Sequence, residues 1–512
     1  MVVYHESKLV GPAVQLLFLN LVADLHIHMS PLNAASLADL VAAAPADANA
    51  ALRPSLPRYD RAQAQIGVVH LGLGAFHRAH QAMVFDALLQ GGDARWGVLG
   101  VAMRSTGLAD ALAAQDGLYA VQVASAESVH WQVVGSVVRT CVAAREPSVV
   151  IDAMAAPATR WVTLTVTEKG YGPALAELLV QGLAARRAAG QGGLTIASCD
   201  NLSDNGRKLR RLCLDAAHAT PGQGADLAHW IDTHCAFPSS MVDRIVPAAT
   251  AQQQSDAAAA LGVDDACALA TEAFTEWVIE NRFTDPADAH VLRAAGVNVV
   301  DDVKPFEEAK LRMLNGSHTA MALLGAVQGW PMIADGMARP AVRQYVSGFM
   351  TGMVMPHLKR PGLPAYRDAL LARFANPALH HKVHQIATDS SLKIPLRWLP
   401  TLNDSLAAGQ VIEPLAFAAA VWMRFLQGVD ETGAAYVMSD PAAASLQALA
   451  RDHRGDVAAS VQALLGVASI WGSDLPRDTR FTGRVAHWLA RIEADGSSVA
   501  LAELNSQTNT TT

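Results

Sequence analysis

Cysteine is scarce in this chain of 512 residues. The five cysteines lie far apart, and none of them forms a CxxC pair: Cys141, Cys199, Cys213, Cys235 and Cys267. This sparse, odd number indicates neither a disulfide framework nor a zinc knuckle, and it fits a reducing, cytoplasmic compartment. Three histidines cluster at residues 380–384 but lack an Asp or Glu at ligand spacing, so the sequence predicts no metal site.

Long runs of one residue type are also missing. The formal net charge is -8 and no extended basic run occurs, so a nucleic-acid partner is not expected. No apolar stretch reaches the about 20 residues of a membrane span. The apolar segment 9–23 has a poor basic flank and no clear cleavage site, so we do not interpret it as a signal peptide. The GxSxG motif of serine hydrolases is absent.

Hydrophobic residues make up 51% of the chain, which predicts a large buried interior and more than one domain. Up to about residue 300, short β-branched runs alternate with helical patterns, as in an α/β domain with a mostly parallel sheet. Beyond residue 301, Ala- and Leu-rich helical patterns dominate. We therefore expect an extension outside the folded core, an α/β domain, a helical domain and a frayed tail, at residues 1–57, 58–300, 301–505 and 506–512.

The strand predicted at 66–71 runs into Gly72-Leu73-Gly74, the start of a dinucleotide fingerprint. His77 replaces the third glycine, so an ordinary strand–glycine–helix turn stays an alternative. The next predicted strand, 96–102, is followed by Arg104-Ser105 and no acid, a pair that could meet a 2′-phosphate. The candidate cofactor-binding residues are Gly72, Gly74, Phe76, His77, Arg78, Arg104, Ser105 and Glu168.

A helical pattern over 305–318 carries the most informative polar residues. At 3.6 residues per turn it places Lys310, Asn315 and His318 within an arc of about 140° and roughly 12 Å of axis, comparable to an extended six-carbon substrate. The alternative is a solvated helix edge with Lys310 outward. Gly316, in mid-helix, favours a close approach instead. Asn201 follows another strand, where it would bind a substrate oxygen or simply cap a helix.

Six ordered segments resemble the polyol-specific long-chain dehydrogenases, the mannitol dehydrogenase family. They are HLGLGAFHRAHQA (70–82), TLTVTEKGY (163–171), SCDNLSDNG (198–206), FPSSMVDRIVP (237–247), WVIENRF (277–283) and KLRMLNGSH (310–318). The resemblance implies a Rossmann-type N-terminal domain, a mostly α-helical C-terminal domain, and metal-independent hydride transfer with NAD. It also implies that Lys310 is the general acid/base and that Asn201 and Asn315 bind the reacting oxygen. By the same resemblance His318 binds substrate and Glu307 lies on the proton path.

Within the family, the chain resembles the fructuronate reductases, which interconvert D-fructuronate and D-mannonate. The mannitol enzymes carry other residues at the positions of Lys169, Arg312 and Gln385. A sugar acid needs a cation for its carboxylate, and the candidates are Lys169, Arg312 and Lys393. Thr106 follows Arg104-Ser105 where mannitol enzymes carry acids, so NADP is possible beside NAD.

Two other functions stay open: a mannitol 2-dehydrogenase or related polyol dehydrogenase, and a non-catalytic sensor of dinucleotide or sugar. The expected partners are a small sugar acid or polyol and, at most, a few further copies of this chain.

Overall fold

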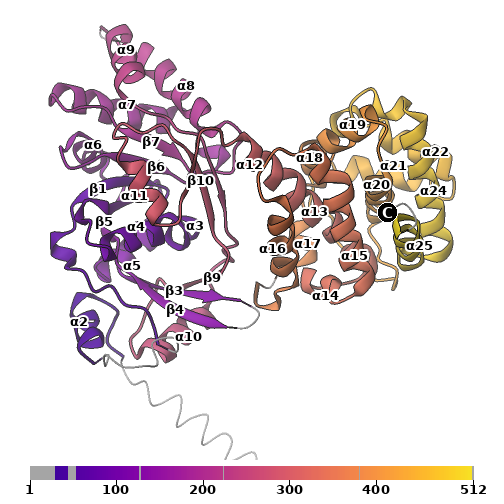
Figure 1. The fold of residues 1–512 in the computed structure, drawn as a ribbon, viewed down its shortest axis with the longest axis horizontal. Coiled ribbons are helices and arrows are strands. Elements are labelled where there is room, and N and C mark those ends of the chain that lie inside the picture. The colour runs from indigo at the N-terminus through magenta and orange to yellow at the C-terminus, as the bar shows by residue number, and fades with distance from the viewer. Residues whose placement is uncertain (1–28, 44–52, 126–127, 223, 380, 510–512) are drawn as a thin grey trace, which may run out of the picture.

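The computed structural model describes residues 29–43, 53–125, 128–222, 224–379 and 381–509. It has two lobes, an N-terminal lobe built on sheets and a C-terminal lobe built of helices, with α12 between them (Figure 1). The expected fold class, a Rossmann-type domain followed by a helical domain, is thus confirmed. Within the described part of the chain, no helix combines the length and the apolar character that crossing a membrane requires.

The central sheet of the N-terminal lobe is parallel throughout, with strand order β5-β2-β1-β6-β7. Its strands are β1 (Ile66–Leu71), β2 (Gly97–Ala102), β5 (Val137–Val142), β6 (Trp161–Leu164) and β7 (Thr195–Ser198). Successive residues of β1 enter different cores: Val68 packs on one face of the sheet and Val69 on the other. Both faces are therefore covered, which is why the strands read as continuous apolar runs.

Two three-stranded sheets complete this lobe, in the orders β4-β3-β9 and β11-β10-β8. Their strands are β3 (Tyr119–Ala124), β4 (Val129–Val134), β8 (Ser240–Asp243), β9 (Leu269–Glu272), β10 (Glu276–Glu280) and β11 (Asn298–Val300). The helices of the lobe are α2 (Ala34–Ala43), η2 (Arg61–Gln63), α3 (Ala75–Ala79), α4 (Gln81–Gln90), η3 (Ala94–Trp96), α5 (Gly107–Ala114), α6 (Pro147–Ala155), η4 (Glu168–Gly170), α7 (Pro173–Ala188), α8 (Asn205–His218), α9 (Gly224–His234), α10 (Ala251–Leu261) and α11 (Asp288–Ala294).

The C-terminal lobe packs its helices around α13 and α20, whose side chains are almost all buried. Its helices are α12 (Lys304–Ala309), η5 (Lys310–Asn315), α13 (Gly316–Gln328), α14 (Ile333–Met337), α15 (Pro340–Gly348), η6 (Phe349–Val354), η7 (Met355–His357), α16 (Leu363–Ala375), η8 (Pro377–Leu379), α17 (Val383–Ile386), α18 (Ser390–Arg397), α19 (Leu399–Ala407), α20 (Glu413–Phe425), α21 (Ala443–Asp452), α22 (Val457–Leu465), α23 (Ala468–Trp471), η9 (Leu475–Arg477), α24 (Thr479–Asp495) and α25 (Ser497–Asn509).

The expectation that residues 1–57 lie outside the folded core is wrong for their described part. Leu32 and Leu37 are buried in a small core with Leu118 of the α/β domain. Ser55 pairs with the edge of β4, where its N–H donates to the carbonyl of Trp131 at 2.8 Å. These contacts join residues far apart in the sequence, so no local sequence pattern predicts them. Residues 1–28 and 44–52 lie outside the described part.

The frayed tail expected at 506–512 is also wrong as far as residue 509. Helix α25 continues to Asn509, because its earlier turns are anchored by the buried Leu501 and Leu504. The last three residues lie outside the described part.

Candidate active site

The turn after β1 is shaped for close approach by another group. Gly72 has φ +105°, and a Cβ on it would lie 2.1 Å from the carbonyl oxygen of Thr165, so no other residue fits. Its N–H donates to the carbonyl of Val101 at 2.8 Å, and Gly74 precedes the first turn of α3. The strand order changes direction beside β1, and in open α/β sheets dinucleotides bind at such a point. The turn therefore fits a dinucleotide.

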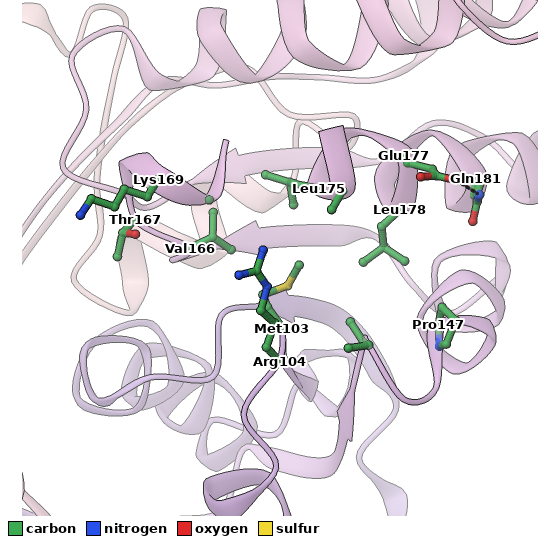
Figure 2. Close-up of a pocket in the computed structure, with 14 residues that line it drawn as sticks. Met103, Arg104, Pro147, Val166, Thr167, Lys169, Leu175, Glu177, Leu178 and Gln181 are labelled. Carbon is green, nitrogen blue, oxygen red and sulfur yellow. Dashed lines mark hydrogen bonds between the residues drawn. The ribbon is translucent and has the colours of Figure 1, made fainter. Parts of the chain in front are cut away.

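A cavity of about 690 Å³ opens at the carboxyl ends of β2, β5 and β6, against α7 (Figure 2). Apolar side chains, among them Leu175 and Leu178, offer flat contact for an aromatic ring. Figure 2 shows Arg104 in the middle of this cavity, with Lys169 towards one end and Gln181 at the other. Arg104 and Lys169 are exposed, as are Ser105 and Glu168, which are close to them in the chain. The size and lining suit the adenosine half of a dinucleotide.

Two of the predicted cofactor-binding residues direct their side chains into the interior of the lobe, away from the cleft. His77 is fully buried and stacks on His70, with ring centroids 3.3 Å apart. Arg78 is buried too, and its Nη1 donates to the carbonyl of Cys267 at 2.5 Å. Their side chains cannot contact a cofactor in the cleft, so cofactor binding at these two positions stays a prediction for the main chain alone. The short helix α3 turns both residues into the lobe. Phe76 is half-buried and stacks on His80, with ring centroids 5.0 Å apart.

Lys310 connects the C-terminal lobe to the sheet domain through its side chain. Its Nζ donates to Oδ1 of Asn201 at 2.9 Å and to the carbonyl of Val242, in β8, at 2.6 Å. The structure therefore brings together two predicted site residues that lie 109 positions apart. Burial lowers the pKa of Lys310 below its ordinary value; Arg373 adds to this effect and Asp243 opposes it.

The helix that carries Lys310 is irregular. Residues Lys310–Asn315 form a π-helical turn, η5, between the α-helices α12 and α13. The arc of 140° expected from regular α-helical geometry therefore does not apply. Single π-helical turns within α-helices are uncommon and occur often at functional sites. Gly316 confirms the expected close approach: a Cβ there would lie 3.3 Å from the carbonyl oxygen of Arg397 in α18.

Asn315 and His318 follow Lys310 on the same helical segment, and both are half-buried. His318 packs between the rings of Phe374 and His381, with centroids 5.1 and 5.3 Å away. Burial keeps its pKa well below the ordinary value, so the imidazole is neutral. Its Nε2 is buried with no hydrogen-bond partner in the described part of the chain. An unpartnered nitrogen at this place is available to a substrate hydroxyl.

Glu307 precedes Lys310 by three residues, a spacing that places two side chains on one helix face. Its Oε1 is buried without a partner among the described residues. Burial, together with the charge of Asp204, raises the pKa of Glu307 to about 7. A carboxyl group with this pKa exchanges protons readily near neutral pH.

The three cations expected to bind a carboxylate have different surroundings. Lys169 lines the cavity that contains Arg104, at the cofactor turn. Arg312 is paired with Asp404, with Nη1 and Oδ2 2.6 Å apart. Lys393, on α18, donates only to neutral oxygens, those of Ile386 and Thr388 at 3.0 and 3.3 Å.

Sequence reasoning assigned no role to a buried ion network where the two lobes meet. Arg373 of α16 binds Asp243 at the end of β8 and Glu272 of β9, with 2.6 Å between the nearest atoms of each pair. All three side chains are at most 5% exposed. Asp243 stands within the family-like segment 237–247, which was the only signal available in the sequence. The network fixes the strand residue next to Val242, and so supports the acceptor that holds Lys310.

Among the residues that the structure describes, no group of three or more His, Cys, Asp or Glu side chains is placed to hold a metal ion.

Comparison with known proteins identifies the family. The model of the mannitol dehydrogenase Rossmann domain matches residues 66–289, and that of the mannitol dehydrogenase C-terminal domain matches residues 302–493. D-mannonate oxidoreductase of Escherichia coli (strain K12) is 37% identical over 88% of this chain and 97% of its own length. Mannitol 2-dehydrogenase of Phaeosphaeria nodorum is 35% identical over 88% of this chain and 83% of its own.

Solved structures of related enzymes indicate the same family. The ternary complex of Pseudomonas fluorescens mannitol 2-dehydrogenase with NAD and D-mannitol has a TM-score of 0.75 and 33% sequence identity, over 93% of this chain and 99% of that one. A crystal structure of D-sorbitol dehydrogenase has a TM-score of 0.78 and 29% identity, over 88% and 98% of the two chains. The chain belongs to the mannitol dehydrogenase family and is an oxidoreductase that acts on an alcohol group.

Proposed function

We propose that this enzyme interconverts D-fructuronate and D-mannonate with NAD, using Lys310 as its general acid/base. The observation that carries the chemistry is the position of the Lys310 ammonium group, between Asn201 and the carbonyl of Val242. Two observations support the substrate: the similarity to D-mannonate oxidoreductase, and the cation Lys393 on α18, which forms no ion pair in the described part of the chain. NAD fits the Gly72–Gly74 turn and the adjoining cavity.

When bound, the nicotinamide accepts hydride from the alcohol carbon or returns it to the ketone. Lys310 accepts the hydroxyl proton during oxidation and donates it during reduction. Two of its three hydrogen-bonding positions are already occupied by Asn201 and Val242, which leaves the third for the reacting oxygen. Burial lowers the pKa of Lys310, which favours the neutral amine that accepts this proton.

Two amides stabilise the charge that develops on the reacting oxygen. The Oδ1 of Asn201 is bound to Lys310, so its NH₂ group is the end that is free to donate. Asn315 offers a second amide from the π-helical turn. Neutral His318 positions a substrate hydroxyl through its unpartnered Nε2. Glu307 passes the proton from Lys310 towards solvent.

A substrate panel tests the proposal. Fructuronate, tagaturonate, fructose and xylulose are each reduced with NADH and with NADPH, and nicotinamide absorbance is followed. We expect the highest kcat/KM with fructuronate. A higher value with fructose would overturn the substrate and favour a mannitol 2-dehydrogenase; no turnover with any of the four would favour the sensor.

A further inference from the structure

Helix α18 presents two cations to the helix that carries the catalytic residues. Lys393 and Arg397 are four residues apart and so share one face of α18. The Nη1 of Arg397 donates to Oγ1 of Thr319 at 2.7 Å and to the main-chain carbonyl of Asn315 at 3.3 Å. Arg397 is therefore tied directly to the residue whose amide is proposed to hold the reacting oxygen.

Several of the buried or half-buried arginines near the junction of the lobes have a carboxylate partner, but Arg397, like Arg244, forms no ion pair in the described part of the chain. Arg373 and Arg360 are each matched by carboxylates, and so is Arg312. Arg397 has only neutral acceptors, and no ion pair involves it or Lys393 in the described part of the chain. Burial lowers the pKa of Arg397 to about 10 and that of Lys393 to about 8.

A partly desolvated cation without a counter-ion is costly, so such groups are usually paired with an anion. Asp389 and Asp440 are the acids whose charges act on Lys393, but neither forms an ion pair with it, and Asp440 already accepts hydrogen bonds from Ser390 and Ser391. The position also fits a substrate. Arg397 is close enough to lower the pKa of both Lys310 and His318, which places it at the edge of the same site.

We propose that Arg397, together with Lys393, binds the carboxylate of the keto-acid substrate, and that Arg397 determines the preference for sugar acids over neutral sugars. This inference rests on the proposed function. Nη1 holds α18 to α13, while Nε and Nη2, which have no hydrogen-bond partner in the described chain, form the fork that receives a carboxylate. Fructuronate carries its carboxylate at the opposite end of the chain from its ketone, so one substrate can reach both Arg397 and Lys310.

The test compares two substrates of equal length in one set of variants: fructuronate, and fructose, which lacks the carboxylate. Arg397→Gln removes the charge, and Arg397→Lys keeps it without the fork. The control, Arg367→Gln on α16, removes an arginine that is paired with Asp368. Steady-state kinetics with NADH are recorded for each protein, with melting temperature and NADH binding as checks of folding.

We expect Arg397→Gln to lower kcat/KM for fructuronate by about 10- to 150-fold, the worth of a hydrogen bond to a charged group. The value for fructose should change by less than about threefold, which is within the scale of one neutral hydrogen bond. Arg397→Lys should lie between Arg397→Gln and the wild type, and Arg367→Gln should leave the ratio of the two substrates unchanged. Equal losses on both substrates would show that Arg397 only holds the helices together, and would overturn the inference.

The wild-type enzyme tests the proposed function, and the Arg397→Gln variant tests the role of Arg397. Wild-type enzyme that reduces fructuronate no better than fructose contradicts the proposed function. Wild-type enzyme that prefers fructuronate, beside an Arg397→Gln variant that keeps the whole preference, refutes the role of Arg397 alone. If Arg397→Gln does not fold, the same ratio in Arg397→Lys decides, because that variant retains a donor towards Thr319.

Discussion

Replacing Lys310 with alanine should remove most of the catalytic rate and little of the cofactor affinity. The ammonium group is held by Asn201 and by β8, at the junction of the lobes, whereas the cofactor turn at Gly72 follows β1. A positioned acid/base contributes roughly 10²- to 10⁴-fold to a rate. That corresponds to about 2.7–5.4 kcal/mol of barrier. NADH binding should therefore stay close to that of the wild type while kcat falls by that factor.

The pH dependence supplies an independent readout of Lys310. Oxidation of the alcohol needs the neutral amine, so its kcat/KM should rise with pH and level off above the lysine pKa. Because burial lowers that pKa, the inflection should lie below the about 10.4 of a free lysine. Reduction of the ketone needs the protonated form and should fall over the same range. In Lys310→Ala this inflection should disappear, and small added amines should restore part of the rate.

The assay follows nicotinamide absorbance in both directions, with NADH binding measured separately. Lys304→Ala, at the exposed start of α12, is the matched control, because it removes a lysine six residues away without touching the site. A Lys310→Ala enzyme that runs within about tenfold of the wild-type rate, with an unchanged pH profile, would refute the assignment; general acid/base catalysis is worth more than that.

Three further predictions concern stability and cofactor choice. Arg373→Met leaves two buried carboxylates without their partner, so the free energy of unfolding in urea should fall by about 3–5 kcal/mol, and a loss below about 1 kcal/mol would contradict the buried network. A chain that starts at Met29 should keep its activity and melting temperature. One that starts at Arg58 loses the buried Leu32 and Leu37 and should be less stable by at least about 3 kcal/mol; equal melting temperatures of the two would disprove this. Thr106 and Gly107, and no acid, follow Arg104-Ser105 in the chain, so the ratio of kcat/KM for NADH to that for NADPH should stay below about a thousandfold, or roughly 4 kcal/mol. A larger ratio would show that another group recognises the ribose.

Much of the sheet domain could be predicted because its signals are local. The apolar run at 66–71 and the glycines after it indicated a strand and a tight turn, and both are present. The meeting of Lys310 with Asn201 could be expected only through resemblance to a family, since no local pattern links residues 109 positions apart.

Other features depend on packing, which the sequence does not display. His77 reads as part of a cofactor motif, yet it is buried against His70, because the direction of a side chain on a five-residue helix is set by its neighbours. Arg397 carries no motif of its own. The role proposed for it rests on its contacts with α13 and on the lack of an ion pair among the described residues, and both depend on how α18 packs. The π-helical turn was missed because its residues are individually compatible with an α-helix.

That turn shows that the helix holds one residue more than a regular α-helix would. A π-helical turn accommodates an additional residue in a helix that is otherwise continuous. Deleting one residue between Lys310 and Asn315 would let the segment relax into a regular α-helix. The helices on both sides would keep their phase, because the deleted residue is the one that the wider turn absorbs. The chain therefore carries, within the segment from Lys310 to Asn315, one residue that the continuity of the helix does not require.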